Sequence, residues 1–319
     1  MAGTDPYHRY FRIAGITVCI TSDLDFSAVK FRVALLRFAV DGPGEDNVTL
    51  HHHFGLPALK KLDLGKTFYR KVPWAISHRD DRWHYLGISN EYNYENLQWV
   101  GIFNNDHTEA VIYSKKRFEG IVRHGERDWP SLSLLPTDQV WLAPLLADRN
   151  AVLLHSAGVI LNGQGLLFVG HSEAGKTTTV DMLKGKAEIL CDDRNIARLW
   201  NGGWRVHGTW SHGDVTDVSA ASAPLRAILF LKQDKRNELV PLSNRKRIWK
   251  ELLATLVKSF ATGAWWRKEM DVLEHLIGNV PCYVMHFDKS GGIVPELEKL
   301  ARTDPNQVRT DDKRGVIRE

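Results

Sequence analysis

The segment Gly170–Thr177, with the sequence GHSEAGKT, limits most strongly what this chain can fold into. It fits the Walker A pattern G-x-x-x-x-G-K-[ST], in which a loop wraps the phosphates of a nucleotide. The short apolar run 166–169 reads as a strand leading into the segment, and residues 178–184 read as a helix leaving it. Because the motif requires a strand, a glycine-rich loop and a helix in that order, this context predicts an α/β nucleotide-binding domain of the P-loop type.

Each part of the loop has a chemical role in that prediction. The backbone N–H groups of the loop and of the first helical turn lack partners, and the helix dipole adds positive charge, so both favour a polyphosphate. Gly170 and Gly175 permit backbone angles and close approaches that a Cβ would block. Lys176 is expected to reach the β- and γ-phosphates of ATP, and Thr177 to bind Mg²⁺. The predicted nucleotide-binding residues are Gly170, His171, Ser172, Glu173, Ala174, Gly175, Lys176, Thr177 and Thr178.

An acidic pair, Asp192 and Asp193, follows the next strand-like run, 187–191. In phosphate-loop proteins an acidic residue at the end of a neighbouring strand holds Mg²⁺ or its waters. A second aspartate there can accept the proton of an attacking hydroxyl. Aspartates at a turn are common for structural reasons alone, but the position one helix after the loop favours the functional interpretation. Either aspartate can be the base or the metal ligand at this point.

The polar segment 206–214 offers a few more candidates. Asp214 is a further candidate for metal binding or for the base, and His207 and His212 are candidate substrate contacts. An ordinary loop is an equally good interpretation of this segment.

Composition limits the class of protein. The chain has 319 residues, room for about two domains, and its 43% hydrophobic and 25% charged residues are typical of globular proteins. The net charge of +4 suits anionic ligands, but no basic run predicts binding to nucleic acid. The three cysteines show neither metal spacing nor a disulfide framework, which suits a cytoplasmic protein. No signal peptide and no apolar run of about 18 residues is present, so no membrane partner is expected.

Residues 1–135 are expected to form a mainly β domain that recognises a substrate. Strand-like runs such as 15–20, 68–72, 82–87 and 108–113, separated by turn signals, predict an antiparallel sheet or partial barrel. The triplet His51–His53 lies in this half, and adjacent strand residues point to opposite faces. The three imidazoles are therefore not expected to converge on one ion, and a half-exposed strand is the preferred interpretation.

Residues 136–301 are expected to form the nucleotide-binding domain, and 302–319 a charged tail that is disordered. Helices are predicted at 137–147, with Thr137 as N-cap, at 244–260 and at 266–277. The sequence Asn162–Gly165 predicts a hairpin turn before the glycine-rich loop.

The second half resembles the catalytic core of the HPr serine kinase family, which shares its nucleotide-binding fold with ATP-dependent phosphoenolpyruvate carboxykinase. The resemblance rests on His155–Gly158, on 165–170 with the loop, and on Leu190–Asp193, and it covers about 137–294. The segments 206–209 and 223–231 also resemble HPr-kinase-like proteins found beside peptide-modification genes. The resemblance implies a mixed-sheet kinase domain of the HPr kinase and carboxykinase type.

The resemblance also implies residue roles. Lys176 would bind the β- and γ-phosphates, Asp192 and Asp193 would supply the catalytic base and a metal contact, and His155 would tune the base or touch the γ-phosphate. The family's glycine-rich loop with Glu and Arg is not found, and Asp214 is the candidate replacement for that Glu. HPr is therefore not implied as substrate, nor is phosphorolysis. Relatives in this family are often oligomers, which leaves a homo-oligomer open.

The leading hypothesis is an ATP- and Mg²⁺-dependent kinase that transfers the γ-phosphoryl group to a hydroxyl. The acceptor is expected to be Ser of a peptide or protein, with a small molecule as a further choice. The alternatives are a carboxykinase-like enzyme acting on a carboxylic acid and a non-catalytic, ATP-dependent peptide-binding module.

Overall fold

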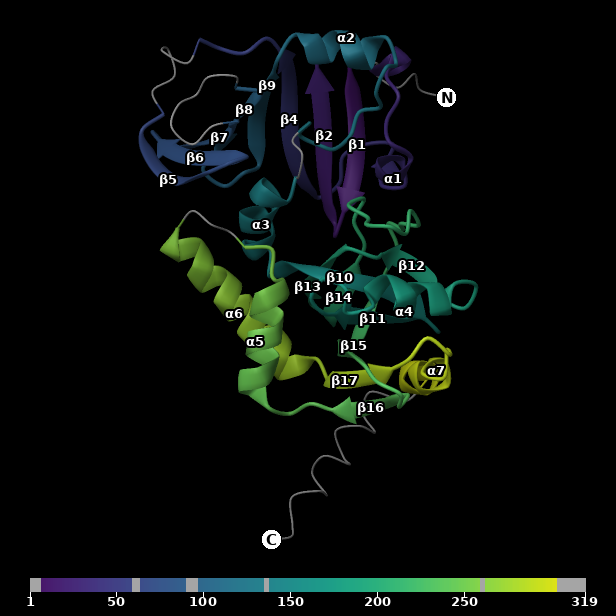
Figure 1. Cartoon of the computed structure of the whole chain (residues 1–319). Coiled ribbons are helices and arrows are strands. Elements are labelled where there is room, and N and C mark those ends of the chain that lie inside the picture. Colours follow the sequence, from purple (N-terminus) through teal and green to yellow (C-terminus); the bar gives the residue numbers. More distant parts are fainter. Residues whose placement is uncertain (1–6, 59–63, 90–96, 135–137, 259–261, 303–319) are drawn as a thin grey trace. The chain divides into compact units, whose positions relative to one another are not determined.

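The computed structural model describes residues 7–58, 64–89, 97–134, 138–258 and 262–302 (Figure 1). It is a mixed α/β protein with two large sheets. Its contacts divide it into unit 1, Met1–Asn150 with Val257–Asp271, and unit 2, Ala151–Leu256 with Val272–Glu319. The division predicted at 135 and 136 lies outside the described residues, as does the predicted tail 302–319 except for Arg302. Within the described ranges, no helix is long and apolar enough to cross a membrane.

Unit 1 contains a nine-stranded sheet with the strand order β3-β1-β2-β4-β9-β8-β7-β6-β5. The pairs β2–β4 and β4–β9 are parallel and the other pairs are antiparallel, so the expected purely antiparallel sheet is wrong. Parallel neighbours need long connections, here 23–45 and 55–108, which turn signals alone do not reveal. The strands are β1 (His8–Ile13), β2 (Ile16–Ser22), β3 (Ala39–Val40), β4 (Asp46–Phe54), β5 (Lys66–Lys71), β6 (Trp74–Arg79), β7 (Arg82–Gly87), β8 (Trp99–Asn104) and β9 (Glu109–Ser114).

The core of unit 1 gathers around Trp129, which is fully buried. Its ring meets Phe26 edge-on at 5.3 Å between centroids and His52 at 4.9 Å. His52 Nε2 donates to the Leu132 carbonyl at 2.9 Å, and burial lowers the pKa of His52 to about 3. The helical segments of this part are η1 (Phe26–Ala28), α1 (Val33–Leu36), α2 (Arg117–Arg123) and α3 (Gln139–Ala147).

Helix α3 confirms the helix predicted up to Ala147, while the predicted cap Thr137 lies outside the described residues. Residues Trp141–Ala147 are all buried, as expected for a helix that is apolar on every side.

Asp138 joins the segment before α3 to the helix itself. Its side chain is 4% exposed, and its carboxylate accepts the N–H groups of Leu132 at 2.8 Å and Ser133 at 2.9 Å. The Ser133 hydroxyl also donates to it, as does Trp141 Nε1 at 3.4 Å. Burial raises the pKa of the Asp138 carboxyl, and these hydrogen bonds oppose the rise. The carboxylate therefore satisfies donors that are buried with it.

Unit 2 contains an eight-stranded sheet in which two long strands connect two layers. The first half of β10, 151–155, pairs with β13, while 156–161 lie between β11 and β12. Likewise, 222–224 of β15 pair with β14, and its later residues lie between β11 and β17. The strands are β10 (Ala151–Leu161), β11 (Gln164–Val169), β12 (Glu188–Cys191), β13 (Arg194–Trp200), β14 (Gly203–His207), β15 (Ser222–Gln233), β16 (Glu238–Pro241) and β17 (Cys282–Phe287).

The predicted hairpin is confirmed between β10 and β11. Its turn residues Asn162 and Gly163 have φ values of 49° and 76°. Both lie in the left-handed region that a type I′ turn requires, which explains the Asn-Gly sequence.

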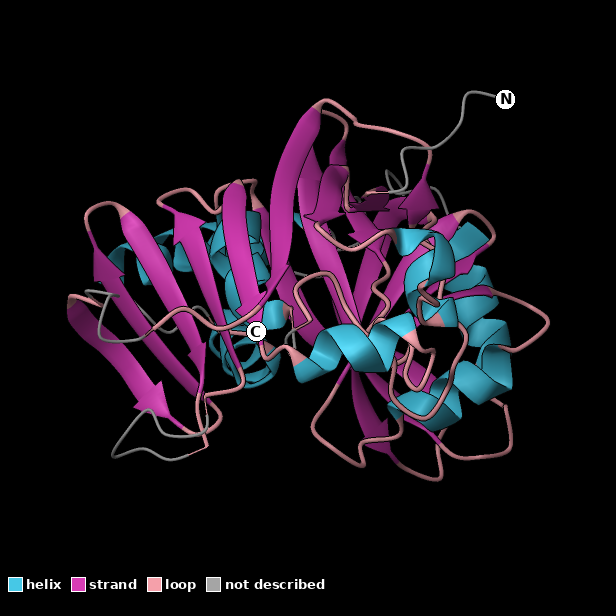
Figure 2. Ribbon diagram, turned by 90° about the horizontal axis from the view of Figure 1, so that it is seen from above, coloured by secondary structure: helices cyan, strands magenta, loops and turns pink. Residues whose placement is uncertain are grey.

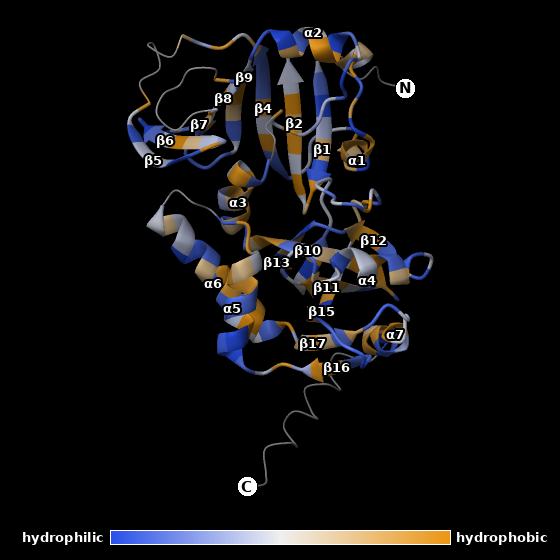
Figure 3. Ribbon diagram, viewed as in Figure 1, coloured by the Kyte–Doolittle hydropathy of each residue, from blue (hydrophilic) through white to orange (hydrophobic). Residues whose placement is uncertain are grey.

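The helices of unit 2 are α4 (Lys176–Leu183), α5 (Arg245–Thr255), α7 (Val294–Arg302) and the later part of α6 (Gly263–Asn279), whose residues up to Asp271 belong to unit 1. Figure 2 distinguishes the helices, in cyan, from the strands, in magenta. Val180 and Leu183 of α4 join Leu297 of α7 in one apolar cluster with the strands, and Figure 3 shows apolar residues along α7 and β17. Asn244 caps α5 by accepting the Arg247 N–H at 3.0 Å, and α5 ends at Thr255, earlier than predicted.

We predict that Asp138→Ala lowers the free energy of unfolding by about 2–4 kcal/mol, because each buried N–H left without its acceptor costs about 1–3 kcal/mol. Urea unfolding followed by tryptophan fluorescence measures the change. Asp148→Ala is the matched control, since Asp148 pairs with Lys268 at the surface of the same unit, and such pairs contribute only about 0–1 kcal/mol. Equal losses for the two variants would contradict this role of Asp138.

Candidate functional site

The candidate site of unit 2 lies where four strands end. β11 runs parallel to β15, and β15 parallel to β17. β11 and β12 are both antiparallel to β10, so β12 runs in the same direction as β11. All four carboxyl ends therefore meet at one edge, which is where open α/β sheets bind ligands.

The glycine-rich segment connects β11 to α4 by a tight turn. Glu173 and Gly175 have φ values of 69° and 102°, so the chain turns through left-handed conformations just before the helix. A Cβ on Gly170 would lie 2.6 Å from Ala174 Cβ, and one on Gly175 would lie 2.6 Å from Phe287 Cζ. Both positions thus require glycine. The Gln233 side chain holds the turn from β15 by donating to the Glu173 carbonyl at 2.9 Å.

Lys176 folds back over the segment that precedes it. Its Nζ donates to the carbonyls of Gly170 at 3.0 Å and His171 at 3.1 Å, and the residue is 8% exposed. Burial lowers the pKa of Lys176, while the charge of Asp193 opposes that effect. The ammonium group is therefore held at the loop by carbonyl groups, near the carboxylates of Asp192 and Asp193, which are called the acidic wall below.

Asp192 is the buried member of the acidic pair at the end of β12, at 3% exposure. Its two carboxylate oxygens accept the N–H groups of Gly213 at 2.7 Å and Val215 at 2.9 Å. A Cβ on Gly213 would come within 3.1 Å of Asp192 Oδ2. Asp192 thus fixes the following loop, and each oxygen keeps lone pairs for a further ligand.

Asp193 contacts a different side chain with each of its carboxylate oxygens. His155 Nε2 lies 2.9 Å from Oδ1, and Arg194 donates to Oδ2 at 2.9 Å. His155 comes from the middle of β10, directly opposite Arg194 of β13 in the register. Burial alone would raise the pKa of the Asp193 carboxyl, but the His155 hydrogen bond and the charges of Arg194 and Lys176 outweigh it and lower the pKa.

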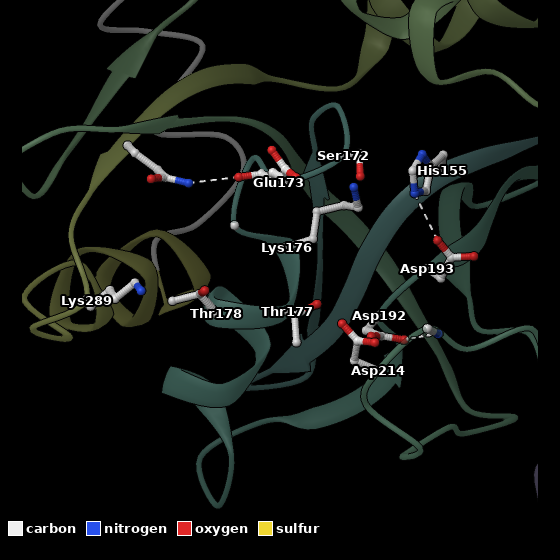
Figure 4. Close-up of a pocket in the computed structure, with 13 residues that line it drawn as sticks. His155, Ser172, Glu173, Lys176, Thr177, Thr178, Asp192, Asp193, Asp214 and Lys289 are labelled. Atoms are coloured by element: carbon white, nitrogen blue, oxygen red, sulfur yellow. Dashed lines mark hydrogen bonds and ion pairs between the residues drawn. The ribbon is translucent and has the colours of Figure 1, made fainter.

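These groups surround one polar cavity of about 440 Å³ (Figure 4). In Figure 4, the aspartates Asp192, Asp193 and Asp214 lie on one side of Lys176 and Thr177, and Glu173 of the loop lies on the other side of Lys176. The predicted site residues that line the cavity are His155, Ser172, Glu173, Gly175, Lys176, Thr177, Thr178, Asp192, Asp193 and Asp214. Gly170, His171 and Ala174 shape the loop without lining the cavity, and the candidates His207 and His212 do not line it either.

Sequence reasoning missed three cavity residues, Gly213, Gln233 and Lys289. Gln233 ends β15, and Lys289 lies two residues after β17. A polar residue just after a buried strand is the signal that could have found the last two. That signal is useful only once those strands are known to run parallel to β11.

We predict that the stabilising effect of Asp193 is lost in acid. Because its pKa is lowered in the folded chain, ionised Asp193 stabilises the fold above the ordinary value of 3.8 and stops doing so as the pH falls through its folded value. The difference in unfolding free energy between the unmodified chain and Asp193→Asn should therefore shrink as the pH falls from about 5 through the lowered pKa of Asp193. Urea unfolding across this range measures it, and a constant or growing difference would contradict the assignment.

No curated protein matches this chain. The solved structure "Structure of the Hpr(Ser) kinase/phosphatase from Coxiella burnetii" matches with 11% sequence identity and a TM-score of 0.30, covering 51% of this chain and 96% of that chain. A likeness at this level carries no argument about function.

The family comparison corrects the expected membership of the HPr serine kinase family, which is wrong. The motifs behind that expectation are short, and loops of this pattern occur in many unrelated families, so they do not discriminate between families. The family model that matches is described as "SynChlorMet cassette protein ScmC", and it covers residues 142–302, about half of the chain. The chain therefore belongs to the ScmC family.

Proposed function

We propose that this chain is an ATP- and Mg²⁺-dependent phosphotransferase that transfers the γ-phosphoryl group of ATP to a hydroxyl, with Ser of a peptide or protein as the preferred acceptor. One observation carries the proposal. The glycine-rich loop with Lys176 and Thr177 faces Asp192, Asp193 and His155 across a single polar cavity. Phosphoryl transfer depends mainly on positioning and charge neutralisation, and this set of groups can supply both.

The loop and α4 are proposed to bind the phosphates as a P-loop. The N–H groups of the first turn of α4 point toward the loop, and the helix dipole favours an anion there. Lys176 already lies at the loop, bound to the carbonyls of Gly170 and His171. Binding of ATP would exchange these two carbonyl contacts for contacts with phosphate oxygens.

The acidic wall is proposed to divide two tasks. Thr177, Asp192 and Asp214 present the hydroxyl and carboxylate oxygens that Mg²⁺ prefers, and they line the same cavity. When bound, the ion would neutralise charge on the phosphates. Asp193 has a lowered pKa, so its carboxylate is ionised at neutral pH, and it is the proposed acceptor of the proton of the attacking hydroxyl. The hydroxyl oxygen then bonds to the γ-phosphorus as the bond to the β-phosphate oxygen breaks and ADP leaves.

His155 is proposed to orient the base. Its Nε2 lies 2.9 Å from one oxygen of Asp193, and Arg194 occupies the other. A carboxylate that is held by a contact at each oxygen presents its remaining lone pairs in fixed directions. Proton transfer is then favoured from a hydroxyl that lies in one of those directions.

The family description directs the search for the acceptor. It names a cassette protein, so peptides and proteins encoded in the same cassette are the first acceptors to test. The test incubates the chain with γ-labelled ATP, Mg²⁺ and these candidates, and follows the label. ATP binding without transfer or hydrolysis would instead support a nucleotide-dependent binding module.

We predict that Lys176→Ala abolishes label transfer, with a loss of at least about 100-fold, because charge stabilisation at the phosphates is removed. Lys184→Ala is the matched control. Lys184 follows the same helix, is exposed and pairs with Asp181, away from the cavity. Transfer by Lys176→Ala at the rate of the control would contradict the proposed role.

We predict that Asp193→Asn lowers the transfer rate by about 10²–10⁴-fold with little change in ATP affinity, because only the proton acceptor is lost. Asp192→Asn should also lower the rate more than ATP affinity, and its residual rate should depend on higher Mg²⁺ concentrations. Single-turnover kinetics and ATP titration separate the two effects, with Asp181→Asn on α4 as the control. Normal transfer by either variant would remove that residue from the mechanism.

A further inference from the structure

The histidine triplet of β4 divides between the two faces of the unit 1 sheet. His52 points into the core, where it is fully buried against Trp129. His51 and His53 lie two residues apart on one strand and share the other face, with side chains 34% and 38% exposed. Their ring centroids are 4.4 Å apart. Two imidazoles thus meet on the accessible face. The expectation from the sequence considered all three histidines together, although the first and third of three strand residues share a face.

A carboxylate reaches the same place from the neighbouring strand. β2 and β4 are parallel and adjacent (Figure 1), with Ser22 opposite His52 in the register. Asp23 follows β2 directly, so it arrives beside His53. Asp23 Oδ2 lies 2.6 Å from His53 Nδ1, and Oδ1 lies 3.5 Å from His51 Nε2. One ligand atom from each of the three residues lies within 4.8 Å of the others.

We propose that Asp23, His51 and His53 form a binding site for a divalent first-row transition-metal ion, with Zn²⁺ as the representative. Two imidazoles and one carboxylate form a donor set that such ions accept, whereas Mg²⁺ and Ca²⁺ favour oxygen ligands. The three residues belong to unit 1, whereas the residues of the proposed phosphotransferase site belong to unit 2.

The distances suit this chemistry. Zinc ligands at about 2.0–2.2 Å from the ion stand about 3.3–3.6 Å apart in a tetrahedral arrangement. The separation of 3.5 Å between His51 Nε2 and Asp23 Oδ1 already falls in that range. The ion would replace the proton that His53 Nδ1 shares with Asp23, and this proton passes to solvent. Asp23 is 67% exposed, so its side chain has room to adjust and a water can complete the coordination.

Neighbouring residues orient both imidazoles. Thr21 Oγ1 lies 2.6 Å from His51 Nδ1, so it can accept the Nδ1–H of the tautomer in which Nε2 is available as a ligand. The ring of Tyr113 stacks on His53 at 5.4 Å between centroids and 21° between planes. Both contacts come from adjacent strands, since Thr21 pairs with His51 and Tyr113 pairs with His53. A hydrogen bond at the ring nitrogen that does not bind the metal, as at His51 Nδ1, is typical of metal-binding histidines.

The test is a Zn²⁺ titration of the full chain in competition with a chromogenic chelator. We expect one equivalent of Zn²⁺ to be lost, or its affinity to fall at least about tenfold, in His53→Ala and in Asp23→Ala. Asp23 lies outside the strand and is exposed, so Asp23→Ala tests the site without removing a strand contact. His124→Ala removes an exposed histidine of unit 1 outside the cluster and should bind as the unmodified chain does.

Two further measurements make the outcome decisive. Asp193→Asn should still bind the equivalent of Zn²⁺ that is assigned to Asp23, His51 and His53. This result would distinguish that ion from any ion held in the cavity of unit 2. Co²⁺ should give visible absorption bands of a nitrogen- and oxygen-ligated ion that vanish in His53→Ala and persist in Asp193→Asn. Zn²⁺ stoichiometry and affinity that remain unchanged in both Asp23→Ala and His53→Ala would overturn the proposal.

Discussion

The candidate site depends on one constraint, the common direction of four strands in unit 2. Because β11, β12, β15 and β17 end at the same edge, the residues that follow them meet although they lie far apart in the chain. Each strand end contributes a different group, namely the glycine-rich loop, the aspartate pair, Gln233 and Lys289. The common direction of these strands therefore determines which residues line the cavity.

Buried polar contacts then give this edge its rigidity. Asp192 is held by two backbone N–H groups, and Asn195 donates to the carbonyls of Ser156 at 2.6 Å and Cys191 at 3.0 Å. These contacts join β10, β12 and β13 at the point where the acidic pair begins. Because buried polar groups are costly to leave without partners, the acidic wall has little freedom to move. On the opposite wall, Ser172 and Glu173 are exposed, and the Gln233 side chain holds the turn through the Glu173 carbonyl.

Local sequence signals predicted the parts of the fold that depend on near neighbours. The strand, loop and helix around Lys176, the Asn162–Gly163 turn and the end of α3 all followed from short patterns. The mixed sheet of unit 1 could not be predicted in this way, because the pairing of β2 with β4 depends on contacts across a long connection. The approach of Asp23 to His51 and His53 was missed for the same reason. Family membership was also missed, since short motifs carry chemistry but do not identify a family.

The position of Lys176 has a consequence for the order of the glycine-rich loop. Its ammonium group donates to the carbonyls of Gly170 and His171, which lie six and five residues earlier in the chain. The lysine thus joins the end of the loop to its beginning. Part of the conformational entropy of this segment is therefore lost when the chain folds.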